Sequence, residues 1–242
     1  MRIKVINPNT LEVMTQGINE TVKMVARPDT EFVTVNPSRG PISIEGMYDS
    51  YLAAPQVIEE VLREKEKYDA YIIACYGDPA LEAVREITEV PVIGICEASL
   101  YIASLLAPNF SIITVIPRVI VPLQQLVAKY GLAQRLASIR VTNLSVEEFA
   151  KDLVAGQRAL LDEGRKAVVE DRAESLLLGC AGMAGLDAMM EKELGVPVID
   201  GVAAAVKLAE ALVDLGKKTS KINTYKYPEK KEFKGMAKIF QP

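Results

Sequence analysis

YIIACYGDP, at residues 71–79, is an apolar run that ends in a cysteine, and LLLGCAGMA, at residues 176–184, repeats this pattern further along the chain. The two cysteines are 105 residues apart, and a glycine stands two residues after each of them, at Gly77 and Gly182. A helical stretch and the tetrapeptide Val-Pro-Val-Ile then follow in both copies. The sequence therefore predicts two similar halves, with one thiol at the matching place in each half.

Short runs rich in Val and Ile alternate with longer periodic stretches along the chain. Several runs are apolar on consecutive residues, as in parallel strands that are buried on both faces. The strands are predicted at residues 3–7, 32–36, 70–75, 92–95, 110–115, 138–142, 175–179 and 196–199. The helices are predicted at residues 11–26, 54–67, 79–88, 98–106, 120–130, 146–169, 184–194 and 202–215.

Eight alternating strands and helices indicate the α/β class. Because the repeat period is about half the chain, we predict two similar flavodoxin-like or Rossmann-like domains related by a pseudo-twofold axis. Each would hold a four-stranded parallel sheet, with the active site in the cleft between the domains. A single eight-stranded barrel is the alternative, and the repeat period disfavours it. The predicted domains are residues 1–97 completed by 206–242, and residues 98–205.

Composition and charge limit the classes of function. Hydrophobic residues make up 50% and charged residues 25% of the chain, and no apolar run reaches the length of about 18–20 residues that spans a bilayer. Three cysteines without paired spacing fit a reducing cytoplasm, and we expect no membrane partner. The net charge of −4 gives no case for nucleic acid. Residues 217–242 carry +6, which predicts a solvated tail or an arm on a neighbouring subunit of a homo-oligomer.

The chain contains no histidine, which excludes several kinds of site. A Ser-His-Asp or Cys-His nucleophile is impossible, and so is a zinc site with histidine ligands. No CxxC pair is present, so we expect no metal. The segment 182–185 has neither dinucleotide-binding spacing nor a phosphate-loop lysine. A general base must therefore be Cys, Asp, Glu, Lys or Tyr.

The two repeated cysteines are candidates for that base. Ligands bind beyond the carboxyl ends of parallel strands, where Cys75 and Cys180 are expected beside the N-terminus of the next helix. Backbone N–H groups there favour a thiolate. Both cysteines could instead belong to the core, since free cysteine is often buried, but their symmetric placement favours a function. Cys96, whose repeat partner is Val202, is interpreted as structural.

Other polar residues at the strand ends are candidates for substrate binding. Asp78 is either the N-cap of a helix that starts at Pro79 or an acceptor for a ligand N–H, and its partner Met183 can be neither. Asn9 has a helix cap as its alternative role, and Ser43 has the role of a loop serine. We expect N–H groups near the two glycines to hold a carbonyl oxygen that gains negative charge. The predicted substrate-binding residues are Asn9, Ser43, Tyr76, Gly77, Asp78, Thr114, Gly182 and Met183.

Four motifs in order resemble the aspartate/glutamate racemase superfamily, and within it the hydantoin/allantoin racemase branch. They are INPNT at residues 6–10, GPISIE at 40–45, ACYGDP at 74–79 and GCAGM at 179–183. The resemblance extends to about residue 225, and it implies a cofactor-independent racemase of two α/β domains. It implies one catalytic cysteine from each domain, here Cys75 and Cys180. One thiolate would remove the proton on the chiral carbon, and the opposite thiol would return a proton to the other face.

The chain departs from the amino-acid racemases of that superfamily, which usually follow their first cysteine with Asn-Thr. Tyr76 and Gly77 stand there instead, which favours a neutral ring such as a 5-substituted hydantoin or allantoin as the small-molecule substrate. Aspartate or glutamate racemisation and maleate isomerase-like chemistry are the enzymatic alternatives. Single-cysteine relatives such as arylmalonate decarboxylases are disfavoured. A binding protein that senses a small ring compound is the alternative outside catalysis, and a thiol–disulfide oxidoreductase is the weakest option.

Overall fold

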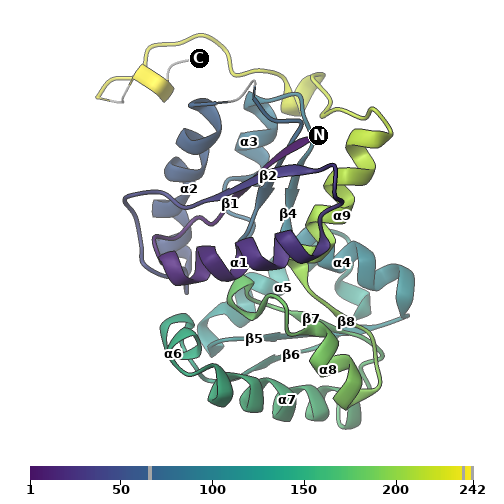
Figure 1. The fold of residues 1–242 in the computed structure, drawn as a ribbon. Coiled ribbons are helices and arrows are strands. Elements are labelled where there is room, and N and C mark those ends of the chain that lie inside the picture. Colours follow the sequence, from purple (N-terminus) through teal and green to yellow (C-terminus); the bar gives the residue numbers. More distant parts are fainter. Residues whose placement is uncertain (65–66, 236–237, 241–242) are drawn as a thin grey trace.

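The computed structural model describes residues 1–64, 67–235 and 238–240, and it contains two four-stranded parallel sheets (Figure 1). The first sheet has the order β2-β1-β3-β4, with strands Arg2–Ile6 (β1), Glu31–Val35 (β2), Ala70–Ile73 (β3) and Val92–Gly94 (β4). The second has the order β6-β5-β7-β8, with strands Phe110–Thr114 (β5), Leu136–Val141 (β6), Leu176–Leu178 (β7) and Val198–Ile199 (β8). The two orders are the same, which confirms the α/β class and the two repeated sheets and excludes the barrel.

Helices connect successive strands, as parallel pairing requires, and one more helix follows the last strand. They are Glu12–Val25 (α1), Met47–Leu62 (α2), Leu81–Ile87 (α3), Ile95–Leu106 (α4), Ile120–Lys129 (α5), Val146–Lys151 (α6), Leu153–Val169 (α7), Asp187–Leu194 (α8) and Gly201–Asp214 (α9).

Two of the predicted helices differ from the observed ones. The helix predicted from residue 54 begins seven residues earlier, so that Pro55 lies inside α2. Residues 65–66, near its predicted end, lie outside the described residues. The helix predicted at 146–169 is divided in two, because the Asp152 side chain accepts a hydrogen bond from Ala155 N at 3.0 Å and caps a new start for α7.

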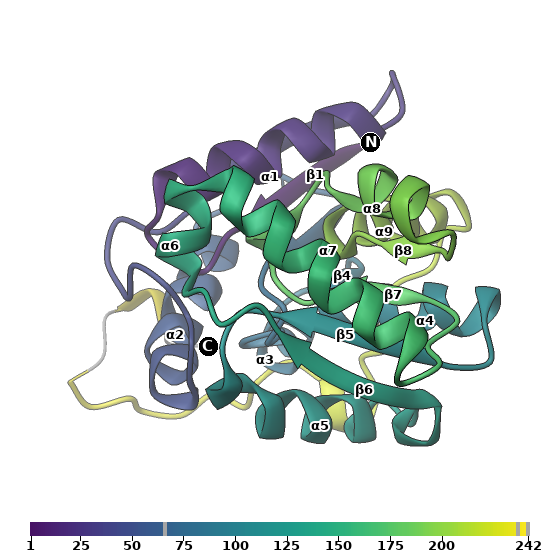
Figure 2. The same ribbon diagram turned by 90° about the horizontal axis from the view of Figure 1, so that it is seen from below.

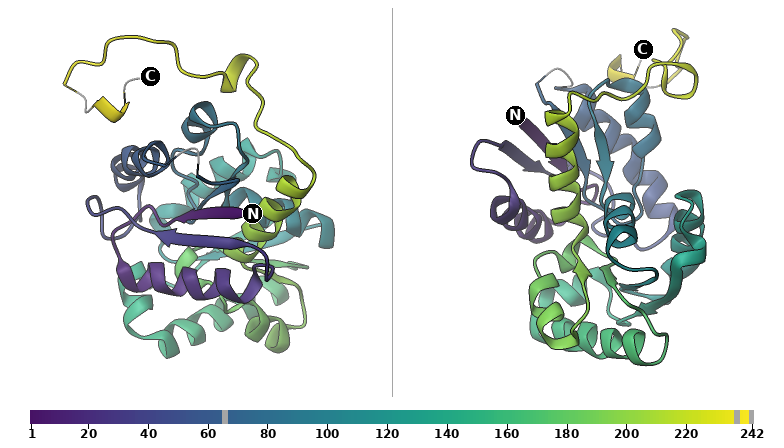
Figure 3. Two further views of the ribbon diagram at one scale, coloured as in Figure 1. Left: turned by 45° about the horizontal axis from the view of Figure 1, so that its top comes forward. Right: turned by 90° about the vertical axis from the view of Figure 1, so that its right-hand side faces the viewer.

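The apolar core has two parts. On one face of the first sheet, α2 and α3 cover a small cluster that includes Val57, Tyr71 and Leu81. The other face of this sheet packs on α1, α4 and α9, and this core runs without interruption into the second sheet (Figure 3). In the second half, α7 and α5 lie on opposite sides of the sheet (Figure 2). The continuous core holds the two sheets in a fixed relation.

The two halves meet where α4 and α9 begin. A side chain on Gly201 would place its Cβ 2.7 Å from the carbonyl oxygen of Ile95, so the close approach of these helices requires glycine. Helix α9 packs against α1, α4, β3 and β4. The domain boundaries at residues 97, 98, 205 and 206 remain predictions, as do the cytoplasmic location and the homo-oligomer.

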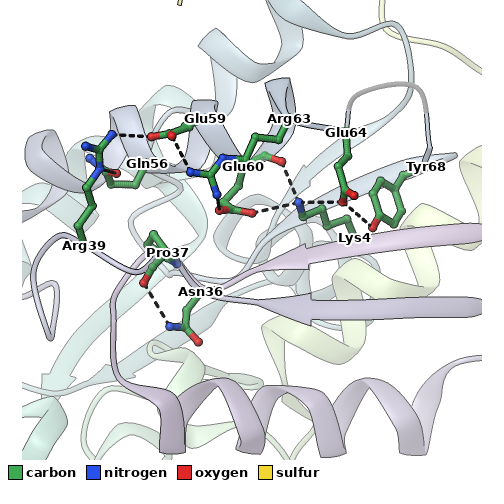
Figure 4. A network of polar contacts seen from close by, with 10 residues as sticks. All are labelled: Lys4, Asn36, Pro37, Arg39, Gln56, Glu59, Glu60, Arg63, Glu64 and Tyr68. Atoms are coloured by element: carbon green, nitrogen blue, oxygen red, sulfur yellow. Dashed lines mark hydrogen bonds and ion pairs between the residues drawn. The ribbon is translucent and has the colours of Figure 1, made fainter. Parts of the chain in front are cut away.

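A network of charged side chains fixes α2 and the preceding loop to the first sheet (Figure 4). The Lys4 side chain on β1 is 3% exposed and donates to the backbone oxygen of Glu60 at 2.8 Å and to its carboxylate at 3.1 Å. A buried ammonium group of this kind is stable only when it is paired. Arg39 in the loop donates to Gln56 at 2.9 Å and to Glu59 at 2.7 Å. The network thus sets the position of the segment that enters α2.

Most described residues of the lysine-rich tail are exposed, as expected for a solvated tail, while a few of them contact the first half of the same chain. An arm on a neighbouring subunit stays a prediction. Thr219 N donates to Glu89 O at 2.7 Å. The Lys221 ammonium donates to the backbone oxygens of Arg85 and Glu86, which belong to the last turn of α3. A cation at a helix C-terminus is favoured by the helix dipole. Across residues 1–64, 67–235 and 238–240, no helix is both long and apolar enough to span a bilayer.

Candidate active site

A cavity of about 530 Å³ lies between the two halves, and both Cys75 and Cys180 line it. Its volume falls in the range of about 300–1,000 Å³ that is usual for small-molecule sites. Strand order explains its position, because the chain leaves neighbouring strands in opposite directions between β1 and β3 and between β5 and β7. Ligands bind at such switch points, beyond the carboxyl ends of the strands. The fold therefore brings the two cysteines, 105 residues apart, to one cavity.

The two cysteine turns share one backbone hydrogen bond. Asp78 N donates to the Cys75 carbonyl oxygen at 2.9 Å, and Met183 N donates to the Cys180 carbonyl oxygen at 3.0 Å. Gly182 N donates to the Cys180 sulfur at 3.3 Å. These bonds correct part of the sequence prediction, because the N–H groups of Asp78 and Met183 close the turns and are not free to hold a ligand oxygen.

Burial determines the protonation of both thiols. It raises the pKa of Cys75 to about 12 and that of Cys180 to about 11, while the Gly77 and Gly182 N–H groups act in the opposite direction. The Cys180 thiol also raises the pKa of Cys75, and the Glu45 carboxylate raises that of Cys180. The predicted effect of backbone N–H groups on the thiols is present but is outweighed by burial, and the predicted effect of the helix N-termini is wrong. Helices α3 and α8 begin six and seven residues after the cysteines, too far for that effect.

Asp78 lines the cavity, but it does not cap the helix that follows it in sequence. Helix α3 begins only at Leu81, and the Asp78 carboxylate instead accepts from the first-turn N–H groups of α4, Cys96 N at 3.1 Å and Glu97 N at 3.0 Å. It also accepts from the Tyr130 hydroxyl at 2.7 Å. Burial raises the pKa of Asp78 to about 7, and the Tyr130 hydrogen bond opposes this shift.

Asn9 lines the cavity. Its Oδ1 accepts from Leu11 N at 3.0 Å and from the Asn7 amide at 2.9 Å, which fixes the orientation of the side chain. Its Nδ2 lies 3.2 Å from the Met14 sulfur, which is a weak acceptor. A ligand carbonyl oxygen would be a stronger partner for this buried donor. Asn9 therefore holds its own backbone turn, and its amide nitrogen has only a weak acceptor as its partner.

The other predicted substrate-binding residues divide into two groups. Tyr76, Gly77 and Thr114 line the cavity, as do Ala181 and Ile44. The Tyr76 hydroxyl turns away from it to Ser99 at 2.9 Å, and the Thr114 hydroxyl donates to Gly179 O at 2.9 Å.

Three predicted residues and the remaining cysteine lie outside the lining of the cavity. The neighbouring residue lines the cavity in two cases, Ile44 rather than Ser43 and Ala181 rather than Gly182. Met183 is fully buried in the core beneath the second cysteine turn. Cys96 is fully buried as well and also lies outside the lining, in agreement with its interpretation as a structural residue.

Sequence reasoning missed the side wall and the mouth of the cavity. An apolar wall comes from α5 and its neighbours, with Val119, Pro122, Leu123, Leu126 and Val146. The mouth contains exposed residues of α2, Met47 and Tyr51, and an ion pair between Glu82 of α3 and Lys129 of α5. Exposed apolar side chains at the start of α2 were the available signal, but their neighbours in α5 are about 70 residues away in sequence.

The loop before α2 crosses to the second half. The Glu45 carboxylate accepts from Val146 N, at the start of α6, at 2.7 Å. A Cβ on Gly46 would lie 3.0 Å from the Arg118 side chain, so glycine allows this close contact. The motif GPISIE thus covers one side of the cavity. Among the residues that the structure describes, no group of three His, Cys, Asp or Glu side chains is placed to hold a metal ion.

A doubly repeated α/β fold with a thiol from each half in one cavity defines a class of enzyme that acts on a small molecule between its two halves. The family model for Asp/Glu/hydantoin racemases matches residues 3–209, and the chain belongs to this family.

The chain is similar to several racemases over nearly its whole length. It is 56% identical over 241 residues to a hydantoin racemase of Pseudomonas sp. (strain NS671), covering 99% of this chain and 97% of that protein. It is 46% identical to a hydantoin racemase of Paenarthrobacter aurescens, covering 96% of this chain and 100% of the other. The solved structure of allantoin racemase from Klebsiella pneumoniae has a TM-score of 0.95 at 42% identity, covering 97% of this chain and 96% of that one. The protein is therefore a racemase, an enzyme of the isomerase class.

Proposed function

We propose that this racemase interconverts the enantiomers of 5-substituted hydantoins by 1,1-proton transfer between Cys75 and Cys180. The observation that carries the proposal is that two equivalent turns bring both thiols to one cavity. The similarity to two hydantoin racemases supports the choice of ring. No histidine is present to act as an alternative base.

The chemistry requires one thiolate and one thiol. The thiolate removes the proton from C5, and the electron pair of the C–H bond moves toward the C4 carbonyl to give a planar enolate. The opposite thiol then donates its proton to the other face of C5, which completes the inversion. The two sulfurs have exchanged protonation states, and exchange with solvent restores the starting form. Asp78 is a carboxylate at the same wall, but its three hydrogen bonds leave it poorly suited to act as the base.

Stabilisation of the enolate is assigned to Asn9. Negative charge develops on the C4 oxygen as the proton leaves, and a donor placed there lowers the barrier. Asn9 lines the cavity, and its Nδ2 group donates to a thioether sulfur, which is a weak acceptor. Its amide orientation is set by the bonds of its own oxygen, so little reorganisation is needed when the ring binds.

The apolar wall supports an apolar substituent at C5. Val119, Leu123 and Leu126 form a surface that an alkyl or aryl group covers favourably, with about 25 cal/mol gained per Å² of apolar area removed from water. The ureido group of allantoin would leave polar atoms unpaired against this wall. Allantoin is therefore the second candidate, supported by the similarity to an allantoin racemase.

The test compares Cys75→Ser, Cys180→Ser and the control Cys96→Ser on single enantiomers of a 5-alkyl hydantoin and of allantoin in D2O. We expect each of the first two substitutions to slow loss of optical rotation by about 10²–10⁴-fold, as removal of a positioned base does. Wild type and Cys96→Ser should both deposit deuterium at C5 of the product. Racemisation at the wild-type rate in either Cys75→Ser or Cys180→Ser would refute the two-thiol mechanism. Faster turnover of allantoin than of the hydantoin would reverse the substrate assignment.

A further inference from the structure

The Cys75 turn is bonded directly to the opposite half of the molecule through Asp78 and Tyr130. We propose that Tyr130 is a positioning residue whose hydroxyl, through Asp78, fixes the distance between the two thiols. This inference rests on the proposed function, because the distance matters only if a proton passes between two sulfurs by way of one carbon. Tyr130 does not line the cavity, and its role is to act through Asp78.

Asp78 is held from three directions. The residue is 4% exposed, and its carboxylate accepts hydrogen bonds from two N–H groups of α4 and from the Tyr130 hydroxyl. Its own N–H closes the Cys75 turn. Asp78 and Ala80 have φ angles of 44° and 61°, in the left-handed region that non-glycine residues rarely adopt. Such backbone persists only where surrounding contacts enforce it. In the Cys75 turn, the contacts of the Asp78 carboxylate have this role.

Tyr130 is itself firmly placed on the second half. It is the C-cap residue of α5. Tyr130 N donates to Leu126 O at 3.1 Å, and Leu132 N donates to Val127 O at 3.1 Å. Val127 is fully buried in the core of the second half. The Tyr130 ring packs edge-on against Tyr101, with centroids 6.3 Å apart. The position of the hydroxyl is therefore set by α5, the helix that carries the apolar wall.

The Cys180 turn is anchored differently. Gly185 N, at the end of that turn, donates to the Asp200 carboxylate at 2.6 Å, and Asp200 belongs to the same half. The turn also packs against α1 of the first half, where a Cβ on Gly185 would lie 3.4 Å from the Thr21 hydroxyl. The hydrogen bond from Tyr130 to Asp78 is thus the polar tie that joins the first cysteine turn to the half that holds the second cysteine.

The separation of the sulfurs decides the stereochemical outcome. Reacting atoms must come within about 3–3.5 Å, and C5 must meet that condition with one sulfur on each face. If the Cys75 turn moves back, the thiolate of one wall still removes a proton while the thiol of the other wall is out of reach. The same thiol then returns a proton to the same face, and it can exchange with solvent first. Loss of the tie should therefore allow exchange without inversion.

The experiment uses Tyr130→Phe, with Tyr101→Phe as the matched control that also removes one tyrosine hydroxyl. One hydantoin enantiomer is incubated in D2O, and deuterium is measured separately in recovered substrate and in product. For Tyr130→Phe we expect inversion to slow about tenfold, equal to about 1.4 kcal/mol of activation free energy, with a raised ratio of deuterium in substrate to deuterium in product. A smaller active fraction alone would lower both and leave the ratio unchanged. An unchanged ratio in Tyr130→Phe, or an equal rise in Tyr101→Phe, would overturn the proposal.

A second measurement needs no substrate. A short bis-methanethiosulfonate reagent is used to cross-link Cys75 with Cys180, and the yield is measured by mass spectrometry of the peptides. The proposal expects a high yield in wild type and Tyr101→Phe and a severalfold lower yield in Tyr130→Phe. Equal yields in all three proteins would contradict it. If the wild type racemises no hydantoin, the proposed function fails while this yield still decides the role of Tyr130.

Discussion

Each cysteine turn is anchored by one carboxylate. In the first half the carboxylate belongs to the turn, and in the second half it belongs to the helix that the turn contacts. In the first half, Asp78 lies on the cysteine turn and reaches to the first N–H groups of α4. In the second half, Asp200 lies at the start of α9, accepts from Val202 N at 2.7 Å, and reaches back to the cysteine turn at Gly185. Both arrangements tie the turn to the helix after the next strand. Both halves thus have a hydrogen-bonded link between the cysteine turn and a helix, but the carboxylate is on the turn in one half and on the helix in the other.

This difference in position makes the two walls chemically unequal. Asp78 lines the cavity, whereas Asp200 is buried outside the lining. The residue at the start of α4 that corresponds to Asp200 is Gly94, and a Cβ there would lie 2.3 Å from the Asp78 carboxylate. The first half therefore needs a residue without a side chain where the second half needs an aspartate. The difference places one titratable carboxylate beside Cys75 and none in the same place beside Cys180.

The most severe test of this comparison is Gly94→Ala. The new methyl group would overlap the Asp78 carboxylate and displace it from α4, which should lower the free energy of unfolding by about 3 kcal/mol. Gly17→Ala is the control, because that exposed position in α1 has open space around it and alanine favours a helix by about 1 kcal/mol. Urea unfolding of both variants measures the difference. A Gly94→Ala protein as stable as wild type would show that the Asp78 contact with α4 is dispensable.

An effect that is smaller for each pH unit is expected in Asp78→Asn. Burial raises the pKa of Asp78 from 3.8 to about 7, so the folded protein holds this proton more tightly than the unfolded chain. The resulting stability is complete below the unfolded value and is lost as the pH rises through about 7. Between the unfolded pKa of 3.8 and about pH 7, the free energy of unfolding of wild type should fall relative to that of Asp78→Asn by up to about 1.4 kcal/mol per pH unit.

Urea titrations at several pH values measure this slope. Asp200→Asn serves as the partner from the second half, since burial also raises the pKa of Asp200 and the slope should have the same sign. A difference between wild type and Asp78→Asn that does not change with pH would mean that the Asp78 carboxylate is not desolvated.

The smallest change in stability is expected for Gly77→Ala and Gly182→Ala. A Cβ at these positions would lie 4.0 Å from the Cys75 sulfur and 3.5 Å from the Cys180 sulfur, which are ordinary contact distances. We expect the free energy of unfolding to change by less than about 1 kcal/mol. Gly77 lines the cavity, so its methyl group should raise KM, whereas Gly182 lies outside the lining and its variant should not. Steady-state kinetics that show the same KM for both variants would remove this distinction between the turns.

The sequence was sufficient for the features that repeat. The strand positions, the two-sheet architecture and the meeting of Cys75 with Cys180 follow from apolar periodicity and from the rule that places sites at strand ends. It was insufficient for contacts between side chains far apart in the chain. The Asp78 carboxylate caps α4 and not α3, because the left-handed backbone at residues 78 and 80 turns it away from the helix that follows.

The same limit applies to the thiols and to the side wall. The amide effect on a thiol can be inferred from a strand end, but the burial that outweighs it depends on both halves being packed together. Tyr130 is 52 residues from Asp78, and no periodicity or turn signal relates the two positions. Ser43 is a predicted substrate-binding residue, whereas the loop presents its apolar neighbour Ile44 to the cavity.

The packing of α9 has a consequence for the order of folding. This helix, at residues 201–214, covers β3 and β4 of a sheet whose strands end at residue 94. During synthesis the first sheet therefore waits for more than a hundred residues with part of one apolar face uncovered, while the second sheet completes its strands by residue 199. Domains usually form in the order in which they are made. Here the half made first is the half finished last, and its exposed face is where a nascent chain would need protection.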